Sequence, residues 1–216
     1  MKSKVVEYAH GHLGRVRHAE KKDRTWSNIE SLINILFSTF VASFVGTRNE
    51  SKNIEKNDAY YFELGCYFFY HIDVWHIDNK YEVFRDKILN GIIVDRYLLL
   101  FQESMKCENL RDVFYNRVGV YFKCYREAFH IDGDDDTKTK YLIGRERYYF
   151  EQLALRALNR VPLEVIDFDN MPVLLVGASK TWAIETAHAA ITSTMIPVVR
   201  NAFQYIYDRL QQNQVD

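Results

Sequence analysis

The chain has 216 residues, with 28 Lys and Arg against 29 Asp and Glu and a formal net charge of −1. It contains 14 Phe, 15 Tyr and 3 Trp but only 9 Gly and 3 Pro. Such a composition excludes a disordered or collagen-like chain, and the near-neutral charge gives no argument for a nucleic-acid partner. The scarcity of turn-forming residues argues against a many-stranded sandwich or barrel. We therefore expect an all-α protein.

The cysteines and the hydropathy pattern indicate a reducing, aqueous compartment. The three cysteines (Cys66, Cys107 and Cys124) are widely spaced and form no CxxC pair, which is typical of neither a disulfide framework nor a zinc site. The N-terminus lacks the apolar core of a secretory signal. The longest uncharged stretch, residues 31–47, is interrupted by Asn34 and several hydroxyl side chains, so we expect a buried helix and no membrane span. These features predict a cytoplasmic protein.

Residues 1–24 form a basic N-terminal arm, with seven Lys or Arg, three Asp or Glu and three of the seven histidines. Residues 25–216 are expected to form one helical bundle domain. Ser27 and Glu30 have the spacing of a capping box, and Gly46 stands where a helix would end. Apolar residues recur at helical spacing between them, which predicts the first helix.

The next predicted helix, over residues 58–75, is the most aromatic part of the chain. Seven aromatic residues fall between positions 60 and 70 (Tyr60, Tyr61, Phe62, Tyr67, Phe68, Phe69 and Tyr70). A helix that is apolar on all sides belongs at the centre of its bundle. Apolar spacing predicts two more helices, over residues 80–104 and from a cap at Asn109 to the acidic loop 132–138.

The C-terminal third is expected to hold two helices. One spans residues 138–159 and is closed by Pro162. The other opens at Pro172 after a cap at Asn170, runs to about residue 212, and is kinked or split near Pro197. The intervening segment 163–169 is read as a connector because a lone strand has no partner. The expected fold is a single-domain bundle of about six helices.

A polar group within the aromatic helix suggests a candidate pocket. Glu63, Tyr67 and Tyr70 share one helical face, with His71 at its margin. A carboxyl group among aromatic rings can act as a ligand or general base with a raised pKa. The alternative is a structural glutamate paired with an arginine of another helix.

Two further patterns contain possible metal ligands. The sequence His71–Asp78 (HIDVWHID) places Asp73 one helical turn from His76, which suits either a hydrogen-bonded pair or a partial metal site. The acidic loop DGDDD resembles the start of a calcium loop but lacks its glycine and its bidentate glutamate, so a solvated loop is the alternative.

The spacing E-x-x-H occurs three times, beginning at Glu7, Glu127 and Glu185. Carboxylate-bridged di-metal bundles combine two such pairs with single glutamates from two other helices, because this spacing places both ligands on one helical face. The ligands predicted on that scheme are Glu63, Glu127, His130, Glu151, Glu185 and His188. Surface or core polar roles are the alternative for each.

Three functions follow as hypotheses. The leading one is a non-enzymatic helical module that acts by protein association, as a homodimer or with another protein, without a cofactor. The first alternative is a metal-dependent oxidoreductase that would require iron or manganese. The second is a bundle that binds an apolar small molecule between the 58–75 helix, the helix after Asn109 and the C-terminal helix.

Overall fold

The structure is a computed structural model that describes residues 57–212 apart from 103, 106 and 176. Its elements are α3 (Asp58–Asp78), α4 (Glu82–Phe84), the π-helix η2 (Arg85–Ile93), α5 (Val94–Gln102), α6 (Leu110–Phe129), α7 (Asp135–Leu158), α8 (Ala178–Ala190), the π-helix η3 (Ile191–Met195) and α9 (Ile196–Gln212). No strand occurs among the described residues, which confirms the all-α prediction for this part of the chain. The basic arm and the predicted first helix lie outside the described residues.

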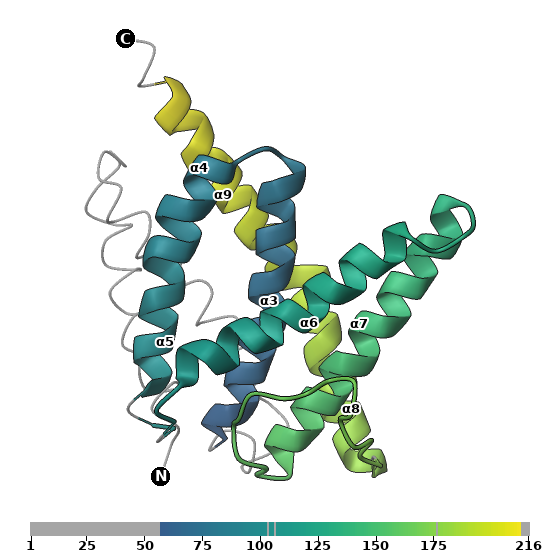
Figure 1. The fold of residues 1–216 in the computed structure, drawn as a ribbon. Helices are drawn as coiled ribbons and strands as arrows, with labels where there is room; N and C mark the ends of the chain where they lie inside the picture. Colours follow the sequence, from purple (N-terminus) through teal and green to yellow (C-terminus); the bar gives the residue numbers. More distant parts are fainter. Residues whose placement is uncertain (1–56, 103, 106, 176, 213–216) are drawn as a thin grey trace.

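Helix α3 is the centre of the fold. Every residue from Tyr60 to Tyr70 is buried, and α3 packs against α6, α7 and α9 (Figure 1). A helix without a polar face must be covered all round, since each exposed large apolar side chain forfeits about 1.5–3 kcal/mol of burial free energy. The central position predicted from the aromatic run is therefore confirmed.

The helix predicted over residues 80–104 is a single helical run with a π-helical middle. Lys80 adopts a left-handed backbone conformation (φ 59°) where the chain turns out of α3, and α4, η2 and α5 then follow without a loop. The nine residues of η2 make π-helical turns, which are rare and occur most often near functional sites.

Helices α6 and α7 are antiparallel neighbours joined by the acidic loop (Figure 1). Helix α7 begins at Asp135, three residues before the predicted start, because Asp134 caps it. The Asp134 carboxylate accepts hydrogen bonds from the Thr137 N–H (2.8 Å) and hydroxyl (2.6 Å). The following acidic residues lie in the first helical turn, where the helix dipole favours negative charge.

The prediction that Pro172 opens a helix is wrong, because α8 begins only at Ala178. The side-chain amide of Gln152 accepts from the Leu174 N–H (2.8 Å) and donates to its carbonyl (3.3 Å), which satisfies the backbone of the segment outside a helix. Asn116 does the same for Ile166, at 2.9 and 3.1 Å. The connector predicted over residues 163–169 is confirmed as irregular structure.

The C-terminal run α8–η3–α9 is helical throughout, and the π-helical segment ends at Met195, two residues before Pro197. Proline has no N–H, so the turn before it lacks one helical hydrogen bond. The kink at Pro197 stays a prediction.

None of the described helices combines the length and apolar character needed to cross a membrane.

Candidate functional site

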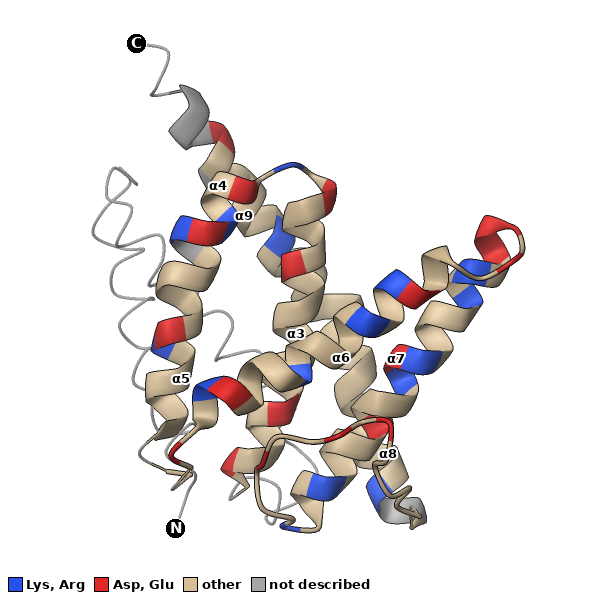
Figure 2. Cartoon of the chain, in the orientation of Figure 1, with Lys and Arg blue, Asp and Glu red and all other residues tan. Residues whose placement is uncertain are grey.

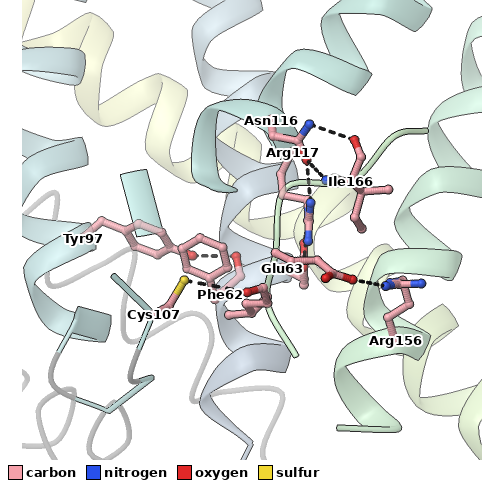
Figure 3. Close-up of polar contacts among 10 residues, drawn as sticks. Phe62, Glu63, Tyr97, Cys107, Asn116, Arg117, Arg156 and Ile166 are labelled. Atoms are coloured by element: carbon pink, nitrogen blue, oxygen red, sulfur yellow. Dashed lines mark hydrogen bonds and ion pairs between the residues drawn. The ribbon is translucent and has the colours of Figure 1, made fainter. Parts of the chain in front are cut away.

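Glu63 is paired with an arginine of another helix. The Arg117 Nε–H on α6 donates to both carboxylate oxygens of Glu63, at 2.9 and 3.1 Å, and both side chains are buried (Figure 3). Burial raises the pKa of Glu63, and the Arg117 guanidinium opposes this rise. The Arg117 guanidinium also donates to Asn116 and lies 5.9 Å from the Phe168 ring centroid. Glu63 thus ties α3 to α6, as the structural alternative proposed.

The other three predicted pocket residues lie together. The Tyr67 and His71 ring centroids are 4.5 Å apart, and those of Tyr70 and His71 are 4.9 Å apart. Tyr67 is joined to α8 by a 3.1 Å hydrogen bond between its hydroxyl and His188 Nε2. Tyr70 donates a hydrogen bond to Glu146 of α7. Helices α3, α7 and α8 therefore share one buried polar cluster.

Glu146 is the residue of this cluster that the sequence reasoning missed. It is 5% exposed, and burial raises its pKa to about 7 against the opposing hydrogen bond from Tyr70. The His71 Nε2 atom lies 3.8 Å from its carboxylate. Burial first, and then the positive charge of Arg200, lowers the pKa of His71 to about 3, so His71 is neutral at pH 7. Nothing in the sequence pattern of α7 distinguishes the buried Glu146 from Glu151.

Several polar atoms near this cluster are buried without a hydrogen-bond partner in the described part of the chain, among them His71 Nε2 and the Tyr121 hydroxyl. The Tyr121 ring lies 5.0 Å from that of Tyr67 and 5.4 Å from that of Tyr70. Such groups cost about 1–3 kcal/mol each unless water pairs with them. Chemically, the cluster can store a proton on the buried carboxyl group of Glu146 near neutral pH.

The residues predicted as metal ligands are placed in separate interactions. Glu151 and Glu185 both accept from the exposed Arg147 guanidinium, at 2.8 and 3.0 Å. Glu127 accepts from the Tyr141 hydroxyl at 3.2 Å, and His130 is the exposed C-cap residue of α6.

Among the described residues, no group of three or more His, Cys, Asp or Glu side chains could hold a metal ion. The E-x-x-H spacing places two ligands on one helical face. It does not bring that face toward the ligands of other helices.

His76 and Asp73 of the HIDVWHID segment bind different neighbours. His76 is fully buried, its Nδ1 lies 2.7 Å from the Ile72 carbonyl, and its Nε2 lies 2.7 Å from the Tyr207 hydroxyl of α9. Asp73 instead forms a bidentate ion pair with Arg85 of η2. Through these two residues, the end of α3 is bonded to α9 and to η2.

An exposed face of low charge runs along α8, η3 and α9. Between Glu185 and Asp208 the chain carries one Lys, Arg, Asp or Glu residue, Arg200, whose guanidinium donates inward to the His71 carbonyl at 3.2 Å. Trp182 and Val198 are 50% and 48% exposed. By contrast, charged residues are spread along α6 and α7 (Figure 2). We name the exposed residues Trp182, Ala189, Ser193, Pro197 and Val198 the C-terminal face.

The hydroxyl groups of Ser193, on this face, and of Thr192, beside it, already have hydrogen-bond partners within the helix. The Ser193 hydroxyl donates to the Ala189 carbonyl (2.7 Å), and the Thr192 hydroxyl donates to the His188 carbonyl (2.9 Å). Glu185, at the edge of the face, is paired with Arg147. The low charge of residues 186–207 is readable from the sequence and could have indicated this face.

Comparisons of the chain with protein-family models, with curated proteins and with solved structures found no match.

Proposed function

We propose that this chain is a non-enzymatic helical module that acts by self-association, with the C-terminal face as the surface between two copies. The observation that carries the proposal is the absence of unpaired charge along an exposed helical face that includes Trp182 and Val198. A helix face that meets only water is usually lined with charged side chains. Exposed apolar residues that gather on one face are typical of interaction sites.

A second copy fits this surface better than a charged partner does. In a two-fold dimer the same patch meets itself, so each charged residue would meet its own copy or a near neighbour. Glu185 at the edge of the face is held by Arg147, which lessens that repulsion. The small side chains Ala189 and Ser193 would let the two helices approach closely.

The proposal is tested by measuring the mass of the full chain in solution by light scattering and sedimentation. We expect a mass of twice 25.6 kDa at micromolar concentrations. The variant Ala189→Lys places a charge at the middle of the face, and its mass should fall to that of the single chain. Thr139→Lys adds the same charge at an exposed position of α7 and is the matched control.

Each outcome has a separate meaning. A wild-type mass of 25.6 kDa at every concentration contradicts self-association. A dimer that persists unchanged in Ala189→Lys keeps self-association and rejects the C-terminal face as its surface.

A further inference from the structure

A pocket of about 320 Å³ lies against the side of α3 that faces η2, α5 and α6. It is bounded by Phe69 and Asp73 of α3, by residues 85–94 of η2 and α5, and by residues 114–122 of α6. The sequence predicts a small-molecule site against α3 and α6 as well, but on the side of the C-terminal helix. The volume lies at the small end of the range for ligand sites in proteins, about 300–1,000 Å³.

The walls of this pocket are apolar and rich in aromatic rings. Phe69, Phe114, Tyr115 and Phe122 contribute rings, and Leu89, Val94 and Val118 contribute aliphatic groups. Aromatic rings pack best against other rings, in edge-to-face or offset arrangements worth about 0.5–1.5 kcal/mol beyond the buried area. The lining therefore favours a flat aromatic molecule over a flexible chain.

Two backbone features line the space. The wall carrying Leu89 and Asn90 is the π-helix η2, whose wider turns are frequent at functional sites. On the opposite wall stands Gly119, in the middle of α6, where glycine costs roughly 1 kcal/mol relative to alanine. A Cβ atom added there would meet no atom within 4 Å, so packing within the protein does not require this glycine.

The charged side chains of the pocket are paired with each other, so the pocket does not require a charged ligand. Asp73 and Arg85 satisfy each other in a bidentate pair, and the exposed Asp86 lies 3.8 Å from the same guanidinium. Asn90 lines the pocket and is partly buried. An amide both donates and accepts, so it can recognise a neutral hydroxyl, amine or carbonyl group.

We propose that this pocket binds a small, uncharged aromatic molecule that carries one hydrogen-bonding substituent, with the ring between the apolar walls and the substituent at Asn90. The site is separate from the C-terminal face, so it does not depend on self-association.

The experiment uses 4-fluorophenol as the probe, followed by fluorine NMR with the full chain. We expect a saturable shift of the fluorine resonance with the wild type and with Gly119→Ala, which changes the backbone propensity but leaves the space open. Gly119→Leu projects a side chain into the pocket and should abolish saturation. Fluorobenzene, which lacks the hydroxyl group, should bind about tenfold more weakly, the fold-change that corresponds to one hydrogen bond.

A second measurement keeps the test independent of how well the leucine variant folds. In the wild type, the Asn90 side-chain amide and the Gly119 backbone amide should shift together and saturate at the same concentration of 4-fluorophenol. Amide resonances that do not move, or a probe shift that is unchanged in a folded Gly119→Leu variant, would overturn the proposal. Equal affinities for 4-fluorophenol and fluorobenzene would remove the role given to Asn90.

Discussion

The Nε–H group of Arg117 lies 2.9 Å and 3.1 Å from the two carboxylate oxygens of Glu63, and neither side chain reaches the surface. The pair joins the central helix α3 to α6 in the middle of the aromatic core. Removing two charges from water costs several kcal/mol per ion, which the mutual attraction repays only when both partners are in place.

Arg117→Met should therefore destabilise the protein by about 3–5 kcal/mol, since it leaves Glu63 buried without its partner. Urea unfolding at pH 7 measures this loss. Adding Glu63→Gln to the same chain should recover a large part of it, because the uncompensated charge is gone. Arg147→Met breaks two exposed ion pairs, with Glu151 and Glu185, and should cost less than about 1 kcal/mol for each. A loss of similar size in both arginine variants would contradict this account.

Gly65 is required by a close approach between α3 and Tyr97 of α5. A Cβ atom at position 65 would overlap the hydroxyl and two ring carbons of Tyr97, whose hydroxyl donates a 2.7 Å hydrogen bond to the Phe62 carbonyl. Gly65→Ala should cost about 1–3 kcal/mol through this overpacking, whereas Gly144→Ala, where nothing lies within 4 Å, should stabilise α7 by about 0.5–1 kcal/mol. Thermal unfolding of both variants tests the contrast. Adding Tyr97→Leu, which removes both the ring and the hydroxyl, should lessen the cost of Gly65→Ala, and an unchanged cost would argue against Tyr97 as its cause.

Asn116 holds the connector between α7 and α8 by bonding both backbone groups of Ile166. Asn116→Ala removes both bonds, together with the hydrogen bond that Asn116 accepts from Arg117. It should cost about 1–3 kcal/mol because a partly buried carbonyl and N–H lose their partner. Hydrogen exchange at the Ile166 amide should accelerate more than exchange at Leu174, which Gln152 holds independently. Asn170→Ala, which removes only an exposed bond to Asp167, is the control. Unchanged exchange at Ile166 would show that the connector is held by other contacts.

The difference between what could and could not be predicted follows from the range of each interaction. The burial of α3 follows from residues within one segment, because seven aromatic side chains in eleven positions leave no polar face. The start of α8 depends on Gln152, which is 22 residues away from Leu174. The same holds for the site, where Tyr67, Tyr70 and His71 are neighbours along one helix. Their partners Glu146 and His188 come from helices whose relative rotation no local pattern reveals. Spacing within a helix predicts which residues share a face, and packing decides which faces meet.

Glu146 should make the stability of the protein depend on pH near neutrality. Its pKa is about 7 in the folded protein, against an ordinary value of 4.5, so the folded state holds the proton more tightly than the unfolded state. This contribution is complete below pH 4.5 and is lost as the pH rises through 7, by about 3 kcal/mol in total. His71 acts in the opposite direction, because its lowered pKa makes stability rise between about pH 3 and 6.5.

The variant Glu146→Gln separates the two effects, since it keeps an oxygen that accepts from Tyr70 and leaves His71 in place. Measured by urea unfolding between pH 4.5 and 8, the variant should gain about 3 kcal/mol relative to the wild type as the pH rises. Glu108→Gln removes one carboxyl group from an exposed position and corrects for the change in net charge. If the stability difference between wild type and Glu146→Gln stays constant across this range, the buried carboxyl of Glu146 does not titrate near pH 7, and the cluster around Tyr70 and His71 holds it in one protonation state throughout.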